Sequence, residues 1–293
     1  MYSIVLNADS GPGHAEENAE RLKRAFREAG ADAHVALVGR GDDVRGVARR
    51  LLEKRPRAIV AAGGDGTVST IADVVRGTDT PLGIVPCGTL NHFARDLGIP
   101  LEPDAAARAI VQGRRRAVDV GEVNGSCFLN NASLGLYPGI VRERTRQQKR
   151  LRRSKRHAML WATLAVLDRP PLLDLQLELD GKVQECRAPF VFVGNNRYVL
   201  EGFDIGRREK LDCGVLDVYT TRSCTPGGLV ALALRAIARR LRQADDFLES
   251  SVTALRVASR RPKLLVATDG EVMTLKTPLE FRVRPRALQV LVP

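Results

Sequence analysis

In the first half of the chain, short apolar runs alternate with stretches in which apolar residues recur every three or four positions. The runs are typical of strands buried on both faces, and the periodic stretches are typical of amphipathic helices. The predicted strands are residues 3–7, 33–38, 58–62 and 82–85. The predicted helices are residues 16–29, 42–54 with Asp42 as N-cap, 67–75, and a further helix from Thr89. This alternation favours a doubly wound parallel sheet, in which ligands bind at the carboxyl ends of the strands.

After Gly121 the pattern changes, because strands predominate and helices become few. The predicted strands are residues 127–132, 173–179, 188–194, 215–220, 252–257, 264–268 and 280–283. The predicted helices are a basic segment that runs into residues 158–167, and residues 228–242. Strand-rich sequence of this kind indicates an antiparallel β-sandwich as a second domain. The last apolar segment, residues 287–292, could pair with either domain.

Composition agrees with two soluble globular domains. The chain has 293 residues, of which 44% are hydrophobic and 27% charged, which excludes disordered and collagen-like classes. The five cysteines are scattered without a C-x-x-C pair, so we expect no disulfide framework and a reducing cytoplasm. The N-terminus lacks the pattern of a signal peptide, and residues 158–167 fall short of the ~20 needed to span a bilayer.

Positive charge is concentrated in one segment, residues 142–157. It holds nine Lys/Arg and one Glu, or 9 − 1 = +8 of a total formal charge of +12. Such a segment can be a solvated face, a nucleic-acid patch or a surface for anionic membranes. No nucleic-acid-binding motif is present, and the charges run into an apolar patch with an interfacial Trp, so we favour peripheral membrane association. The residues expected at the membrane are Lys149, Arg150, Arg152, Arg153, Lys155, Arg156 and Trp161.

Two glycine-rich turns follow neighbouring predicted strands. Residues 63–67 read GGDGT and open a helix, and residues 86–91 read PCGTLN. Glycine lets backbone approach a phosphate closely, a helix N-terminus attracts anions, and an aspartate there can hold Mg²⁺. Neither a Walker A sequence nor G-x-G-x-x-G is present, and a plain βα turn is the alternative. Much later, Asp269-Gly270-Glu271 follows an apolar strand, and by itself it favours a hairpin turn.

Taken in order, the motifs resemble those of a known family. They are GGDGT (63–67), PLGIVPCGTLNHFARDLGIP (81–100), VDVGEVNG (118–125), FLNNASLG (128–135), GVLDV (214–218), TDGE (268–271) and the closing run 285–293. Together they resemble the diacylglycerol kinase catalytic-domain family, in its bacterial soluble lipid kinase branch, which is related to the sphingosine kinases. The resemblance implies ATP- and Mg²⁺-dependent transfer of the γ-phosphoryl group to a lipid hydroxyl. It also implies an α/β nucleotide-binding domain, residues 1–122 with 285–293, a β-sandwich lipid domain, residues 123–284, and an active site in the cleft between.

The resemblance also implies roles for individual residues. Asp269 would be the general base that takes the proton of the lipid hydroxyl, and Glu271 would support the metal or the base. The expected nucleotide-binding residues are Asn7, Gly63, Gly64, Asp65, Gly66, Thr67, Gly88 and Thr89. The expected metal-binding residues are Asp65, Asp119 and Glu271.

Two positions depart from the family pattern. His92 stands where the family usually has Asp, a carboxylate that would join the metal network. Cys213 stands where an acidic loop often holds a structural divalent ion. One alternative is an NAD kinase-like phosphotransferase, a class that shares GGDGT. The other, which His92 motivates, is a degenerate, membrane-associated nucleotide-binding protein. The residues are compatible with diacylglycerol, monoacylglycerol, phosphatidylglycerol, a sphingoid base or undecaprenol as acceptor, and with a homodimer.

Overall fold

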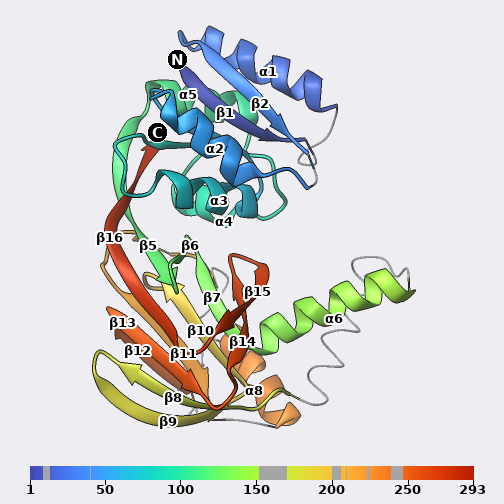
Figure 1. The fold of residues 1–293 in the computed structure, drawn as a ribbon, viewed down its shortest axis with the longest axis vertical. Helices are drawn as coiled ribbons and strands as arrows, with labels where there is room; N and C mark the ends of the chain where they lie inside the picture. The colour runs from blue at the N-terminus through green and yellow to red at the C-terminus, as the bar shows by residue number, and fades with distance from the viewer. Residues whose placement is uncertain are drawn as a thin grey trace. The chain divides into compact units, whose positions relative to one another are not determined.

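A computed structural model describes residues 1–8, 14–39, 41–151, 170–199, 206–208, 210–222, 225–238 and 247–293 of the chain. It divides into two compact units (Figure 1). The first comprises Met1–Val120 together with Arg284–Pro293, and the second comprises Gly121–Val283.

The first unit is built on a parallel sheet with the strand order β2-β1-β3-β4-β16. All five residues of β3 are buried, as expected for a central strand covered on both faces. β16 is a long strand whose final residues return to this sheet, where Val290 pairs with Leu82. The strands are β1 (Tyr2–Asn7), β2 (Ala33–Val38), β3 (Ile59–Gly63), β4 (Leu82–Pro86) and β16 (Leu279–Val292).

Helices cover both faces of this sheet. α1 packs against α5, and α2 packs against α3, so the two pairs lie on opposite faces, as right-handed crossovers require (Figure 1). In α1 the buried residues Ala19, Leu22, Ala25 and Phe26 recur at helical spacing and turn one stripe inward. The helices are α1 (Ala15–Glu28), α2 (Val44–Glu53), α3 (Asp65–Val75), α4 (His92–Asp96) and α5 (Pro103–Gln112).

The four predicted helix starts in the first unit differ from the observed starts by one to three residues, and α2 and α4 are the clearest examples. The N-cap of α2 is Asp43, whose carboxylate accepts the Gly46 amide at 2.9 Å, whereas Asp42 accepts the Gly39 amide. The next predicted start, Thr89, lies outside α4, which begins at His92. At α2 two adjacent carboxylates compete for one cap, and the turn that precedes the helix decides between them. At α4 the N-cap is Asn91, which has left-handed backbone and no side-chain cap hydrogen bond.

The second unit contains two sheets whose strands within the unit pair antiparallel. One has the order β12-β11-β10-β7-β14-β15, and the other joins the start of β16 to β13, β8 and β9, with β5 and β6 beside it. The strands are β5 (Arg114–Val123), β6 (Ser126–Phe128), β7 (Asn131–Gly135), β8 (Leu173–Leu179), β9 (Lys182–Ala188), β10 (Phe190–Asn195), β11 (Leu216–Thr221), β12 (Phe247–Val252), β13 (Ala254–Ser259), β14 (Lys263–Thr268) and β15 (Glu271–Lys276). The helices are α6 (Leu136–Leu151) and α8 (Pro226–Ile237).

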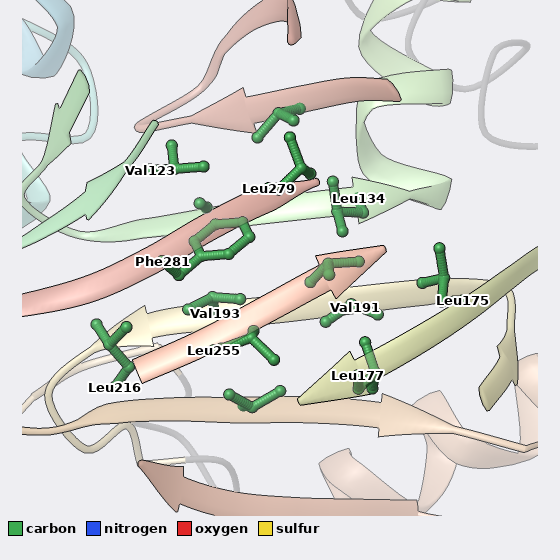
Figure 2. Close-up of a cluster of buried hydrophobic side chains, with 14 of the residues drawn as sticks. Val123, Leu134, Leu175, Leu177, Val191, Val193, Leu216, Leu255, Leu279 and Phe281 are labelled. Carbon is green, nitrogen blue, oxygen red and sulfur yellow. The ribbon is translucent and has the colours of Figure 1, made fainter. Parts of the chain in front are cut away.

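The core of the second unit lies between these two sheets. Figure 2 shows Phe281 and Leu255 of one sheet directed toward Val193 and Leu134 of the other, and all four side chains are buried. Phe281 also packs edge-on against Phe128 at 6.5 Å between ring centroids. The predicted fold class, an α/β domain with an antiparallel β-sandwich domain, is therefore confirmed.

Three strand predictions need correction. The predicted strand 127–132 is two strands, because a turn separates β6 from β7, and the predicted strand 252–257 is split between β12 and β13. These two lie in different sheets, so the chain passes from one sheet to the other at Thr253, which is exposed. The last apolar segment is the continuation of the preceding strand, because β16 runs unbroken from Leu279 to Val292.

Candidate active site

The predicted nucleotide-binding residues of the first unit lie at or just beyond the carboxyl ends of β1, β3 and β4. After β1 the chain turns to α1 on one face, and after β3 it turns to α3 on the other. This divergence is the topological switch point of the sheet, where a crevice opens because the two connections leave in opposite directions. Asn7 ends β1 and Gly63 ends β3, so the sequence brings two predicted site residues to this point.

A hydrogen bond joins the end of β1 to the helix that follows β3. The Asn7 side-chain amide donates to the Thr67 hydroxyl at 3.1 Å, and Thr67 is buried in the first turn of α3. Gly63 makes this packing close, because a Cβ there would lie 2.8 Å from the Thr67 side chain. The contact fixes the start of α3 against the end of β1.

The turn after β4 contacts the turn after β3 through two glycines. A Cβ on Gly88 would lie 2.7 Å from the Gly64 Cα, so the turns approach more closely than a side chain at residue 88 allows. Asn91 holds the second turn, since its Oδ1 accepts the Gly88 amide at 3.0 Å and its Nδ2 donates to the Gly88 carbonyl at 2.8 Å. Residue 91 is left-handed, with φ of 51°. Our prediction omitted Asn91, although the PCGTLN motif contains it.

The N-terminus of α3 has backbone groups suited to an anion such as phosphate. Gly64 is its N-cap without a side-chain hydrogen bond, and Asp65 and Gly66 are its first residues. Amides of a first helical turn lack intrahelical acceptors, and together with the helix dipole they attract an anion. Asp65 and Gly66 are partly buried and Thr89 is exposed. The arrangement suits a phosphate chain with a metal-binding carboxylate beside it.

A pocket of about 380 Å³ adjoins these turns within the first unit. Leu6, Leu22 and Leu101 give it an apolar wall, and it shares Gly88 and Thr89 with the predicted nucleotide-binding residues. Its size falls in the range of small-molecule sites.

One wall of this pocket carries an ion-pair cluster between α1 and the start of α5. Arg21 contacts Asp104 at 2.8 Å and Glu102 at 3.1 Å, and hydrogen bonding from Arg21 lowers the pKa of the Asp104 carboxyl. Cys87 lies on the same pocket, where burial raises the pKa of its thiol. Burial of this kind disfavours the thiolate, and Cys87 adds a small side chain to the pocket wall.

In the second unit, Asp269 and Gly270 form the two-residue turn between β14 and β15. Both have positive φ, 48° and 88°, as a type I′ hairpin requires. The hairpin interpretation is therefore correct, and it is compatible with a catalytic role. Three consecutive backbone amides donate to the Asp269 carboxylate, from Leu129 at 2.7 Å, Asn130 at 2.8 Å and Asn131 at 3.2 Å. They fix the carboxylate in one orientation.

The remaining predicted metal-binding residues have different surroundings. Glu271 is exposed at the start of β15, opposite Thr268. Asp119 is buried on β5, and its Oδ1 accepts the amide of Arg286 at 2.9 Å, where β16 has a residue with φ of 51°. That contact gives Asp119 a structural role, and its metal role stays a prediction.

Among the described residues, no three His, Cys, Asp or Glu side chains gather to hold a metal ion. A nucleotide-bound Mg²⁺ is compatible with this, because it uses one or two carboxylates together with phosphate oxygens. Asp65 at the helix start is a suitable ligand of that kind. Near Cys213, the residue 213 amide donates to Asn196 Oδ1 at 2.7 Å, so protein groups hold that loop.

The position of His92 allows one departure from the family to be tested. His92 is exposed and is the first residue of α4, where the helix dipole favours a carboxylate. We expect His92→Asp to keep kcat within about threefold and to change the free energy of unfolding by less than ~1 kcal/mol. Steady-state kinetics and thermal melts measure both. An inactive His92→Asp variant beside an active parent protein would show that the imidazole itself is required.

The predicted membrane surface lies mostly outside the described residues. α6 extends through Lys149 and Arg150 as backbone, and the other residues, Arg152, Arg153, Lys155, Arg156 and Trp161, are outside the described ranges. Within the ranges that the structure describes, every helix is too short or too polar to cross a membrane.

Two family models and several known proteins are similar to this chain in sequence. Residues 1–123 match the diacylglycerol kinase catalytic domain, and residues 136–292 match the YegS C-terminal NAD kinase beta sandwich-like domain. A diacylglycerol kinase of Mycobacterium tuberculosis is 31% identical over 299 residues, covering 99% of this chain and 94% of the relative. A Pseudomonas aeruginosa protein named "Probable lipid kinase YegS-like" is also 31% identical, over 296 residues, with the same coverage.

Solved structures agree on the fold. The crystal structure of a diacylglycerol kinase from Bacillus anthracis superposes with a TM-score of 0.72 at 20% identity, covering 100% of this chain and 96% of that one. A second structure from that organism gives a TM-score of 0.78 at 24% identity, covering 100% and 97%. The two domain matches define the class, a diacylglycerol kinase catalytic domain followed by an NAD kinase beta sandwich-like domain. Within that class, the chain belongs to the diacylglycerol kinase family, among the bacterial YegS-like lipid kinases. It is a lipid kinase, and as a kinase it uses ATP.

Proposed function

We propose that this lipid kinase transfers the γ-phosphoryl group of Mg·ATP to the hydroxyl of a diacylglycerol-type lipid. The observation that carries the proposal is the meeting of Gly64 and Gly88 at the switch point, beside the N-terminus of α3. The names of the relatives support the acceptor class, since the Mycobacterium tuberculosis protein is called a diacylglycerol kinase.

The first unit binds the nucleotide in this proposal. The amides at the start of α3 receive the phosphates, and Gly64 and Gly88 leave room for them. The pocket beside Gly88 takes another part of the nucleotide, because its apolar wall and volume suit a small organic group. Asp65 would hold Mg²⁺, which when bound neutralises charge on the phosphates.

The second unit supplies the base. Phosphoryl transfer depends on positioning and on charge stabilisation, and it needs a carboxylate to orient the attacking hydroxyl. Asp269 suits this role because three amides hold it in a single orientation. In the reaction we propose that Asp269 orients the lipid hydroxyl and accepts its proton, while Glu271, two residues along, supports the base.

The experiment is a radiolabel transfer assay. [γ-³²P]ATP and Mg²⁺ are incubated with the protein and a panel of lipids in mixed micelles: diacylglycerol, monoacylglycerol, phosphatidylglycerol, a sphingoid base and undecaprenol. NAD is included as a non-lipid acceptor. We expect the label to enter diacylglycerol at the highest kcat/KM. Labelling of NAD in preference to every lipid would overturn the proposal.

We further propose that the basic segment docks the protein on anionic membranes, since its substrate stays in the bilayer. The support is charge, because each Lys or Arg near an anionic leaflet contributes ~1 kcal/mol and acts within a Debye length of ~8 Å. Replacing Arg150, Arg152, Arg153 and Arg156 with Gln should weaken binding to phosphatidylglycerol vesicles at least tenfold. Activity on a short-chain, water-soluble acceptor should stay within twofold.

A matched control removes the same charge elsewhere. Arg187, Arg256, Arg261 and Arg282 are exposed on the second unit, so replacing all four with Gln changes the net charge equally. Vesicle co-sedimentation compares the two variants, with and without competing DNA. Equal sedimentation of the parent protein and the first variant would refute the docking proposal. If DNA displaces the protein from vesicles while vesicles do not displace it from DNA, a nucleic-acid partner is favoured.

A further inference from the structure

A buried arginine of the second unit contacts the segment that holds Asp269. Arg208 is only 2% exposed. One of its Nη atoms donates to the Leu129 carbonyl at 2.6 Å and to the Asn195 carbonyl at 3.1 Å, and the other donates to Asn130 Oδ1 at 2.7 Å. A guanidinium is costly to bury unless oxygens receive its hydrogen bonds, and here residues 129 and 130 provide two of them.

The guanidinium and the Asp269 carboxylate bind opposite ends of one peptide group. The carbonyl of the Leu129–Asn130 peptide accepts from Arg208, and the amide of the same peptide donates to Asp269 at 2.8 Å. A cation at the oxygen and an anion at the N–H polarise the peptide in the same sense, so each bond strengthens the other. A displacement of this peptide therefore displaces the carboxylate.

Other contacts fix the same segment around this peptide. The Asn195 side-chain amide donates to the Leu129 carbonyl at 2.9 Å, and the Asn195 backbone amide donates to the Asn130 carbonyl at 2.9 Å. The Arg208 guanidinium also lies over the Tyr198 ring, 5.5 Å from its centroid. Arg208 is the charged member of this arrangement, and it reaches both Leu129 and Asn130.

We propose that Arg208 is a positioning residue for phosphoryl transfer. It fixes residues 129–131 so that their three amides hold Asp269 in the orientation that accepts the hydroxyl proton. The inference rests on the proposed role of Asp269 as base. A misplacement of about 1 Å can lower the rate ~10²-fold, so a segment that sets the carboxylate position acts on kcat without touching the nucleotide.

The test compares Arg208→Met, which keeps length without charge, with Arg208→Lys, which keeps charge with a single donor group. We expect kcat on the best lipid to fall at least tenfold in Arg208→Met and by an intermediate factor in Arg208→Lys. The Kd for Mg·ATP should stay within twofold, and guanidinium chloride at millimolar concentration should restore part of the Arg208→Met activity. Arg256→Met, at an exposed arginine of the same unit, is the matched control and should keep kcat.

A purely structural role predicts a different result. It would lower Tm while kcat per folded molecule, measured below Tm, stayed within fivefold of the parent, and that outcome overturns the proposal. If Arg208→Met fails to fold, Asn130→Ala tests the same contact from the acceptor side. It should lower kcat at least threefold, and an unchanged kcat overturns the proposal.

Asp269→Asn, assayed in parallel, separates this inference from the proposed function. An inactive Asp269→Asn beside a fully active Arg208→Met removes the inference and leaves the proposed base in place. An active Asp269→Asn removes the base and the inference together. If Arg208 acts through Asp269, the double variant is no slower than Asp269→Asn alone, because residues that act as a unit are not additive. If the fold-losses in kcat of the two single variants multiply in the double variant, Arg208 acts independently of Asp269 and the inference is overturned.

Discussion

Asp269→Asn should lower kcat on the best lipid acceptor by ~10²–10⁴-fold, the usual contribution of a positioned general base. The Kd for Mg·ATP should stay within about twofold, since the predicted nucleotide-binding residues belong to the first unit. The substitution replaces one carboxylate oxygen with an NH₂ group, which cannot accept a hydrogen bond from a backbone amide. One of the three bonds from residues 129–131 is therefore lost, and a fall in Tm accompanies the loss of activity.

The chain contains a matched control for that fall in stability. Asp180 and Gly181 form another Asp-Gly turn with positive φ, between β8 and β9, and the Asp180 carboxylate accepts the amides of Thr253 and Ala254. Asp180→Asn makes the same chemical change in the same kind of turn. It should lower Tm comparably and leave kcat unchanged. If Asp269→Asn retained more than about a third of parental kcat, Asp269 would not be the base.

The comparison of these two turns shows what the sequence can predict here. Each turn is an Asp-Gly pair between two paired strands, and Asp-Gly is a strong turn dipeptide, so the dipeptide alone does not distinguish the two positions. Asp269 differs because it lies within the TDGE motif and because the 128–135 motif supplies the amides that bind it. The residue types and their order could therefore be predicted, and the contact between the two motifs could not.

The elements themselves follow a similar rule. Strands such as β3, which are buried on both faces, have apolar runs that periodicity detects, so the fold class could be predicted. Helix starts such as Asp43 depend on which of two adjacent carboxylates fits the turn, and composition does not distinguish them.

Buried polar residues are the hardest to predict. Arg208 lies in the run Arg207-Arg208-Glu209-Lys210, and charged residues of such a run usually lie on the surface, so nothing local signals its burial. Asp119 was predicted to bind the metal because of its motif. In the structure its carboxylate accepts the backbone amide of Arg286, which lies in β16, far along the chain. Both roles depend on long-range partners.

The two glycine turns of the first unit allow a test that separates nucleotide binding from folding. In Gly88→Ala the new Cβ would lie 2.7 Å from the Gly64 Cα and 2.8 Å from Asn91 Oδ1, so backbone must move. We expect a lower Tm and at least a tenfold weaker Kd for Mg·ATP. In Gly64→Ala the new Cβ would lie 3.5 Å from the Gly88 Cα, an ordinary contact, and φ of −85° is open to any residue.

Gly64→Ala should therefore keep Tm within about 2 °C, because a tolerated surface change alters stability by ~0.5 kcal/mol or less. Its Kd for Mg·ATP should still weaken at least fivefold, since the methyl group occupies space that a phosphate needs beside the start of α3. Gly227→Ala is the control for the substitution itself, because no atom lies within 4 Å of its Cβ. Calorimetric titration measures the three affinities. Unchanged affinity in both Gly64→Ala and Gly88→Ala would place the phosphates elsewhere, whereas loss in Gly88→Ala alone would mean that the turns matter only for folding.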